Sequence, residues 1–198
     1  MKKALIIFVR NPEKGKVKTR LAATVGEERA LSIYLELLTH THTISAAADA
    51  DKFIFYADKV RVNDCWVGVR FSKELQGDYD FGGKMKEAFS IVFEKGYQQA
   101  IIIGSDCLEL STAIIEEAFA VLKQKDIVLG PAADGGYYLL GMTKLVGFIF
   151  ENKEWSTETV FNQTVEDLQR ENISYSKLIT LTDVDTEEDW IKTKFSNL

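Results

Sequence analysis

The sequence predicts an α/β fold built on a buried, mostly parallel β-sheet. Short continuous apolar runs, at 4–9 and 100–103, are typical of strands that are covered on both faces, as in the middle of a parallel sheet. After the first run, Leu31, Leu35 and Leu38 repeat at helical spacing. Strands that alternate with helices in this way indicate the α/β class.

The predicted elements extend along the whole chain. We expect strands at 4–9, 51–56, 67–71, 100–104, 126–130, 137–142 and 175–181. We expect helices at about 27–47, around Met85, at about 111–123 and 158–171, and from Thr186 onward. Asp134-Gly135 between two apolar runs is a strong hairpin signal, so the strands at 126–130 and 137–142 are expected to be neighbours.

Length and composition limit the classes of function. A chain of 198 residues suits one domain, 1–198. The net charge of −6 argues against broad nucleic-acid binding, because nucleic-acid binders usually carry a basic face. Two cysteines are too few for a disulfide framework and favour a reducing, cytoplasmic setting. The first apolar run is too short for a signal peptide, and no run reaches the ~20 residues of a membrane span.

A cationic loop follows the first predicted strand. Its basic residues are Arg10, Lys14, Lys16, Lys18 and Arg20, and Glu13 is the one acidic residue among them. A strand, a glycine-containing basic loop and a helix form a general anion-binding design, although no Walker A pattern is present. The planar guanidinium of Arg20 can bind two phosphate oxygens at once, with Lys18 as a point charge beside it. The alternative is a solvated, lysine-rich loop.

Two carboxylates are expected at one edge of the sheet. Asp106 follows the central strand, and Asp185 follows the last strand. The carboxyl ends of strands form the ligand-binding edge of α/β proteins. Because Mg²⁺ usually takes one or two carboxylates plus substrate phosphates, Asp106 and Asp185 are candidate ligands of Mg²⁺ or Mn²⁺. The alternative is that Asp106 caps a turn.

Two glycine-rich turns each carry a further carboxylate. Asp80 is either the N-cap of the next helix or part of a loop that shapes a substrate pocket. Asp134 belongs either to a hairpin turn alone or to the pocket, where Gly135 and Gly136 would let a ligand approach the backbone closely. We take these four residues as candidate acceptor-binding residues.

Several motifs occur in one order along nearly the whole chain. They are Pro12 to Leu21 with Lys18-Thr19-Arg20, Asp80-Phe81-Gly82 with Met85, Gly104-Ser105-Asp106, Gly130 to Tyr138, Trp155-Ser156-Thr157 and Asp183-Val184-Asp185-Thr186. Together they resemble a bacterial family of glycosyltransferase-A-like proteins, the radical-SAM/selenodomain-associated transferases. The wider resemblance is to the nucleotide-diphospho-sugar transferase superfamily, which includes phospholactate and molybdenum-cofactor guanylyltransferases.

This resemblance implies a Rossmann-like three-layer α/β/α sandwich with a mostly parallel mixed sheet and a nucleotide bound at the N-terminal half. The nucleotide-binding residues that it implies are Arg10, Gly15, Lys18, Thr19 and Arg20. Lys18, Arg20 and Asp106 are the candidate catalytic residues. Asp106 matches a metal-binding Asp of the superfamily. Asp185 opens an Asp-Thr-x-x-Asp element, whose first Asp often supplies the second metal ligand.

The sequence departs from the family pattern in two places. Gly83-Lys84 stands where the family usually has an acidic residue and Arg, which affects the expected acceptor pocket. Glu109 follows the Ser-Asp-Cys motif, in which a proline after the cysteine is usual, and this departure affects only a turn.

These features together predict a metal-dependent transferase with a nucleotide substrate and a small-molecule acceptor. In one reaction, a nucleotide sugar donates its sugar and the metal stabilises the departing nucleoside diphosphate. In the other, a phosphorylated acceptor attacks a nucleoside triphosphate and releases pyrophosphate. The family resemblance favours the first reaction, and the cationic loop favours the second. A noncatalytic nucleotide-binding module is a further alternative.

Overall fold

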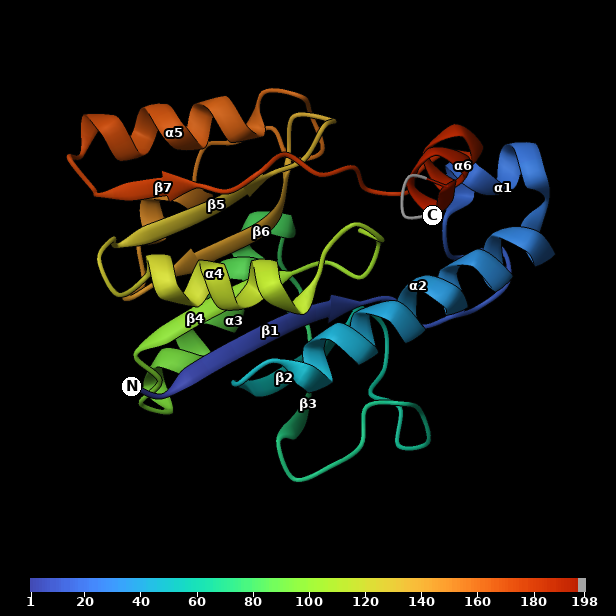
Figure 1. The fold of residues 1–198 in the computed structure, drawn as a ribbon, viewed down its shortest axis with the longest axis horizontal. Coiled ribbons are helices and arrows are strands. Elements are labelled where there is room, and N and C mark those ends of the chain that lie inside the picture. The colour runs from blue at the N-terminus through green and yellow to red at the C-terminus, as the bar shows by residue number, and fades with distance from the viewer. Residues whose placement is uncertain (196–198) are drawn as a thin grey trace.

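The structure is a computed structural model and describes residues 1–195. Seven strands form one sheet in the order β3-β2-β1-β4-β6-β5-β7 (Figure 1). They are β1 (Lys3–Val9), β2 (Asp51–Tyr56), β3 (Phe71–Leu75), β4 (Gln99–Ile103), β5 (Ile127–Pro131), β6 (Tyr137–Met142) and β7 (Tyr175–Lys177). Among these strands, β6 alone runs antiparallel to its neighbours. The predicted mostly parallel, mixed sheet is therefore confirmed.

Helices cover both faces of the sheet. They are α1 (Thr19–Val25), α2 (Glu27–Ala47), α3 (Phe81–Glu94), α4 (Thr112–Val121), a 3₁₀ turn η1 (Gly147–Phe150), α5 (Val160–Arg170) and α6 (Glu187–Phe195). Helices α2 and α4 pack on one face, and α3 and α5 pack on the other (Figure 1). The result is the three-layer α/β/α arrangement.

The alternation of side chains along β1 explains the two apolar layers. Leu5 and Ile7 are buried in the core that includes α2 and α4, whereas Ala4 and Ile6 are buried in the core that includes α3 and α5. Because successive side chains of a strand point to opposite faces, a continuous apolar run is what a doubly covered strand requires.

A third, smaller core joins the two ends of the chain beyond the sheet. Leu21 of α1, Ile33 of α2 and Trp190 of α6 pack together around the fully buried Val184. Figure 1 shows α1, α6 and the beginning of α2 grouped at the end of the sheet to which β1 points. This core holds the loop after β1 next to the segment after β7.

Two predicted element boundaries are wrong, and one helix was not predicted. The third strand was expected at 67–71, but β3 begins at Phe71, because the stretch before it lies in an exposed loop that leaves Val69 fully exposed. The last strand was expected at 175–181, but β7 ends at Lys177, because its ladder with β5 ends at the pair Leu129–Lys177 and Leu181 forms an isolated bridge with Ala132. The short helix α1 was not predicted.

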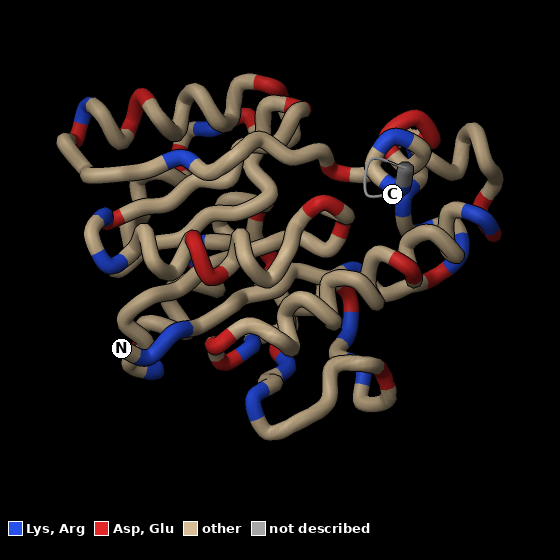
Figure 2. Tube along the Cα trace, in the orientation of Figure 1, with Lys and Arg blue, Asp and Glu red and all other residues tan. Residues whose placement is uncertain are grey.

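Charged residues are distributed over the chain without a single basic face. Figure 2 shows Lys and Arg interspersed with Asp and Glu along the helices and loops, while the central strands carry few of either. Among the described helices, none combines the length and the apolar character needed to cross a membrane.

Candidate functional site

The loop after β1 brings a lysine between two aspartates. Lys18, the residue before α1, has φ 48° and ψ 49°, a left-handed conformation that is uncommon for a residue other than glycine. Its side chain is 7% exposed, and its Nζ lies 3.0 Å from Asp106 Oδ2 and 3.1 Å from Asp185 Oδ1. Arg20 Nη1 lies 3.4 Å from Asp185 Oδ2. The structure thus joins four of the predicted site residues in one ion-pair network.

This network keeps Lys18 positively charged. Burial lowers the pKa of Lys18, but the negative charges of Asp106 and Asp185 and their hydrogen bonds outweigh it, so that the pKa lies above its ordinary value. The two carboxylates remain partly open to solvent, with side chains that are 39% and 34% exposed. Oxygen atoms of both aspartates are therefore accessible to a ligand.

A backbone hydrogen bond holds the segment after β7 next to the residues that follow the central strand β4. Val184 N donates a hydrogen bond to Asp106 O at 2.9 Å, and the Val184 side chain is fully buried. Because side chains alternate along an extended segment, Asp183 and Asp185 both point away from Val184. Both of these aspartates line the cavity at the end of the sheet.

Two further side chains fix this segment. Glu109 Oε2 accepts a hydrogen bond from Thr182 N at 2.7 Å. Asp189 Oδ2 accepts hydrogen bonds from Asp185 N at 3.2 Å and from Thr186 N at 2.8 Å. The Thr-x-x-Asp stretch thus forms a cap at the start of α6, as expected for such a sequence. Glu109, at a departure from the family pattern, positions the site rather than only altering a turn.

A cavity of about 650 Å³, here called the cationic cavity, lies along the loop after β1. Its basic lining residues are Arg10, Lys16, Lys18, Arg20 and Lys84. Thr19 also lines it, as do Asp106 and Asp185. Positive groups therefore surround the space next to the two carboxylates, which is the environment that phosphate groups need.

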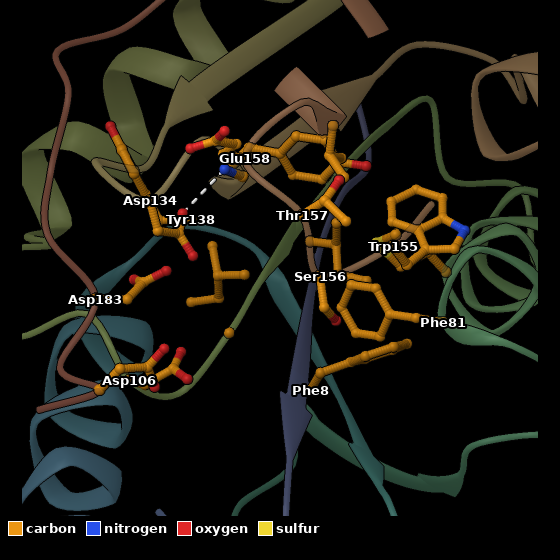
Figure 3. Close-up of a pocket in the computed structure, with 18 of the residues that line it drawn as sticks. Phe8, Phe81, Asp106, Asp134, Tyr138, Trp155, Ser156, Thr157, Glu158 and Asp183 are labelled. Carbon is orange, nitrogen blue, oxygen red and sulfur yellow. Dashed lines mark hydrogen bonds between the residues drawn. The ribbon is translucent and has the colours of Figure 1, made fainter. Parts of the chain in front are cut away.

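A second cavity of about 350 Å³, here called the aromatic–acidic cavity, is shown in Figure 3. It adjoins the first, because the two share lining residues. Its aromatic lining residues are Phe8, Phe81, Tyr137, Tyr138 and Trp155, and its acidic ones are Asp106, Asp134, Glu158, Asp183 and Asp185. Arg20 is the one basic residue in its described lining. The two cavities meet at Arg20, Asp106 and Asp185, which line both.

Asp183 is the most deeply placed carboxylate of the aromatic–acidic cavity. Its Oδ1 is buried and has no hydrogen-bond partner among the described residues. Burial, together with the negative charges of Asp106, Asp134 and Asp185, raises the pKa of Asp183 well above its ordinary value. Figure 3 shows its carboxylate between those of Asp106 and Asp134.

Comparison with known proteins places the chain in a family. Residues 40–157, more than half of the chain, match the family described as "Uncharacterized protein conserved in bacteria (DUF2064)". The chain belongs to the DUF2064 family. No curated protein matches this DUF2064 protein in sequence.

Solved structures share its fold over nearly the whole length. A "putative nucleotide-diphospho-sugar transferase" from Desulfovibrio desulfuricans G20 is 31% identical, with a TM-score of 0.87 over 94% of this chain and 84% of that chain. A CMP:2-keto-3-deoxy-manno-octonic acid synthetase complexed with CTP is 11% identical, with a TM-score of 0.63 over 100% and 98% of the two chains. Rv0371C of Mycobacterium tuberculosis H37Rv, in complex with manganese, is 12% identical, with a TM-score of 0.59 over 99% and 100%.

Three predicted site residues lie outside the lining of both cavities. Gly15 turns the loop with φ 76°, and a side chain there would meet Glu27. Asp80 is the N-cap of α3, where its Oδ1 accepts a hydrogen bond from Gly83 N at 2.7 Å. Gly135 has φ 89°, and its backbone lies against the backbone of Glu158. The binding roles given to these three residues stay predictions.

The remaining predicted acceptor residues lie at the aromatic–acidic cavity of the DUF2064 protein. Asp134 and Gly136 both line it, and Asp134 Oδ1 accepts a hydrogen bond from Gly136 N at 2.9 Å (Figure 3). Asp134 is exposed at the rim. The turn therefore presents its carboxylate to the opening of the cavity.

Sequence reasoning assigned no role to Asp183 and missed the aromatic wall. A signal for Asp183 is present in the sequence, because alternation around an apolar residue at 184 places 183 and 185 on one side. Phe8 lies within the apolar run of β1 and has no such signal, since its neighbours are equally apolar. Only the geometry at the strand end distinguishes it from the core.

The carboxylates of Asp106 and Asp185 are placed so that both can bind one positive centre, as a divalent cation requires. Asp106 and Asp185 each direct an oxygen at the same positive centre, Lys18 Nζ. Within residues 1–195, no group of three or more His, Cys, Asp and Glu side chains is arranged to hold a metal ion. Two carboxylates, with waters and substrate phosphates completing the shell, are a common arrangement for Mg²⁺. The residues fit such an ion on the condition that Lys18 moves aside.

Proposed function

We propose that this DUF2064 protein is a metal-dependent glycosyltransferase that uses a nucleotide-sugar donor. The observation that carries the proposal is the meeting of the two cavities at Arg20, Asp106 and Asp185. The cationic cavity suits the phosphates of a donor, and the aromatic–acidic cavity suits an acceptor. Transfer between the two then takes place where the cavities meet. The radical-SAM/selenodomain association that the motifs imply stays a prediction.

The basic residues neutralise the diphosphate of the donor in this proposal. Arg20 contributes a planar guanidinium to two phosphate oxygens, and Lys18 and Arg10 add positive charge along the same cavity. Mg²⁺ or Mn²⁺, when bound at Asp106 and Asp185, would add charge stabilisation of the departing nucleoside diphosphate. The manganese complex of the M. tuberculosis fold relative supports this choice of metal.

The proposed transfer needs no nucleophilic side chain of the protein. Cys107, the residue next to Asp106, is buried, and burial raises the pKa of its thiol. A thiol held in its neutral form is a poor nucleophile. Direct attack by the acceptor on the sugar, with catalysis by position and charge, is therefore the proposed route.

Nucleotidyl transfer is the second candidate. The cationic cavity has enough basic residues for a triphosphate, and a synthetase of the same fold is known in complex with CTP. In the form of this reaction that the sequence predicts, the acceptor is phosphorylated. With Asp106 and Asp185 assigned to the metal, the aromatic–acidic cavity still has three acidic lining residues, Asp134, Glu158 and Asp183, and this wall would repel a phosphate. This charge difference favours the glycosyltransferase.

A thermal-shift screen tests the proposal. Nucleotide sugars, nucleoside diphosphates and nucleoside triphosphates are each added with Mg²⁺ or with Mn²⁺. A ligand at ~100 times its dissociation constant stabilises the fold by about 2.7 kcal/mol, which gives a clear rise in Tm. We expect the largest rise with a nucleotide sugar and metal. A rise with a triphosphate and none with any nucleotide sugar would favour nucleotidyl transfer instead. No rise with any nucleotide would contradict both.

Turnover separates the enzyme from a noncatalytic module. The best nucleotide sugar is incubated with pools of small-molecule acceptors, and release of nucleoside diphosphate is measured. A noncatalytic module binds the nucleotide sugar but releases no diphosphate with any acceptor pool.

A further inference from the structure

We propose that the acceptor of this protein carries a cationic group, such as a protonated amine, next to an apolar or ring-shaped body. The inference rests on the proposed function, because it assigns the aromatic–acidic cavity to the acceptor. It names the chemical class of that acceptor from the walls of the cavity.

The first observation is the charge of the cavity wall. Even when Asp106 and Asp185 are assigned to Lys18, Arg20 or a divalent cation, three acidic residues remain: Asp134, Glu158 and Asp183. The described lining offers no further basic residue to balance them. Asp134 and Glu158 are exposed, whereas Asp183 has a buried carboxylate oxygen, so the attraction for a positive ligand group is strongest at Asp183. The wall as a whole favours a positive ligand group and disfavours a negative one.

The second observation is the unpartnered oxygen of Asp183. Its Oδ1 is buried at the cavity and has no hydrogen-bond partner within residues 1–195. A buried polar atom without a partner is costly, so a ligand that supplies a hydrogen-bond donor there gains more than the same contact at the surface would give. An ammonium group carries three such donors as well as the complementary charge.

The third observation is the aromatic wall opposite the carboxylates. Phe8 and Phe81 have ring centroids 6.3 Å apart, and Phe81 and Trp155 have ring centroids 5.7 Å apart, both in edge-to-face arrangement. Figure 3 shows these three rings on one side of the cavity and Asp106, Asp134 and Asp183 on the other. An apolar body would pack on the rings, and the faces of aromatic rings also attract cations.

Three small probes of similar shape and different charge test the inference. They are 2-phenylethylamine, 2-phenylethanol and phenylacetate, and their binding is measured by NMR titration at neutral pH. Because charge is the main difference between them, we expect the amine to bind roughly tenfold more tightly than the alcohol, and phenylacetate to bind most weakly. Equal binding of the amine and the alcohol, or tighter binding of phenylacetate, would overturn the inference.

Two variants assign the effect to this wall. We expect Asp183→Asn to bring the affinity for the amine down to that for the alcohol, while binding of the alcohol changes little. Asp134→Asn, on the exposed rim, gives a second reading should Asp183→Asn fold poorly, and a smaller loss for the amine is expected. Asp49→Asn is the control, because Asp49 is 79% exposed and precedes β2 at the opposite edge of the sheet. A loss of amine binding in Asp49→Asn equal to that in Asp183→Asn would contradict the assignment.

Nucleotide-sugar binding is measured on the same samples, so that the two proposals fail separately. Binding of a nucleotide sugar without preference for the amine leaves the glycosyltransferase in place and rejects the cationic acceptor. Preference for the amine without any nucleotide binding supports the cationic site and rejects the proposed function.

Discussion

Lys18 and Asp106 form a 3.0 Å ion pair between residues 88 positions apart in the sequence. The same ammonium group contacts Asp185, so a lysine of the loop after β1 stands between the two carboxylates that were predicted to bind a metal. This arrangement means that Lys18 and a divalent cation compete for the same oxygen atoms. In the proposed reaction, Lys18 moves away from the two carboxylates when the metal binds and contacts the phosphates of the donor.

Replacement of Lys18 by methionine tests this competition. Because the variant leaves two carboxylates without their ammonium partner, we expect Mn²⁺ to bind the nucleotide-free protein more tightly, by roughly tenfold or about 1.4 kcal/mol. Affinity for the nucleotide should fall. Isothermal titration calorimetry measures both. Lys16→Met is the matched control, since Lys16 lines the cationic cavity but pairs with Glu13, and its affinity for Mn²⁺ should not change. Weaker Mn²⁺ binding by Lys18→Met would refute the competition.

Glu109 is expected to hold the segment that carries Asp183 and Asp185. Its carboxylate accepts the hydrogen bond of Thr182 N, and removal in Glu109→Ala leaves that donor unpaired at a cost of about 1–2 kcal/mol in the free energy of unfolding. Metal-dependent nucleotide binding should weaken as well. Urea denaturation and calorimetry measure the two effects. Glu117→Ala, at an exposed position of α4, should change neither, and equal behaviour of the two variants would show that Glu109 has no positioning role.

Gly135 is expected to tolerate no side chain. Its φ is 89°, and a Cβ atom there would lie 2.1 Å from the carbonyl oxygen of Glu158, so the backbone would have to move. Gly26 has a similar φ of 80° but has no atom within 4 Å of such a Cβ. Gly26, with ψ 157°, has a backbone conformation that residues other than glycine rarely adopt, so Gly26→Ala should lose about 1–3 kcal/mol of unfolding free energy through strain, and Gly135→Ala clearly more. Equal losses in urea denaturation would disprove the close contact.

Stability should depend on pH through Asp183. Burial raises its folded-state pKa well above its unfolded value, so the folded protein binds the extra proton in the window between the two pKa values. The contribution of Asp183 to the free energy of unfolding therefore decreases as pH rises through that window. It recovers as pH falls toward the unfolded-state pKa. Asp183→Asn removes the penalty, and we expect this variant to be more stable than the wild type at neutral pH. Urea denaturation at several pH values measures the difference, which should shrink on acidification. A difference that stays constant with pH would speak against a raised pKa.

Most of the fold follows from local patterns in the sequence. The helix predicted at 27–47 matches α2, and the strand predicted at 51–56 matches β2, because strong periodicity and long apolar runs leave one solution. The start of β3 was misplaced because Val67 and Val69 resemble strand residues, yet both are exposed in a loop. Burial on an edge strand is set by the neighbouring strand rather than by the local sequence.

The site was predicted only in part, because some of its contacts depend on tertiary structure rather than on the local sequence. Asp106 and Asp185 could be placed at one edge because each follows a strand. The salt bridges between them and Lys18 could not be predicted, since they depend on the left-handed backbone of Lys18 and on the core around Val184. Asp80 is the opposite case, because its role as helix N-cap could be predicted from the local sequence alone.

The central claim is that tight nucleotide binding by this protein depends on a metal ion held at Asp106. Calorimetric titration of the best nucleotide ligand into wild type and Asp106→Asn, each with and without Mn²⁺, tests it most directly, with circular dichroism to check the fold. We expect Mn²⁺ to raise the affinity of the wild type by roughly tenfold or more and to have no effect on the folded variant. Equal, metal-dependent affinity in the two proteins would contradict the account.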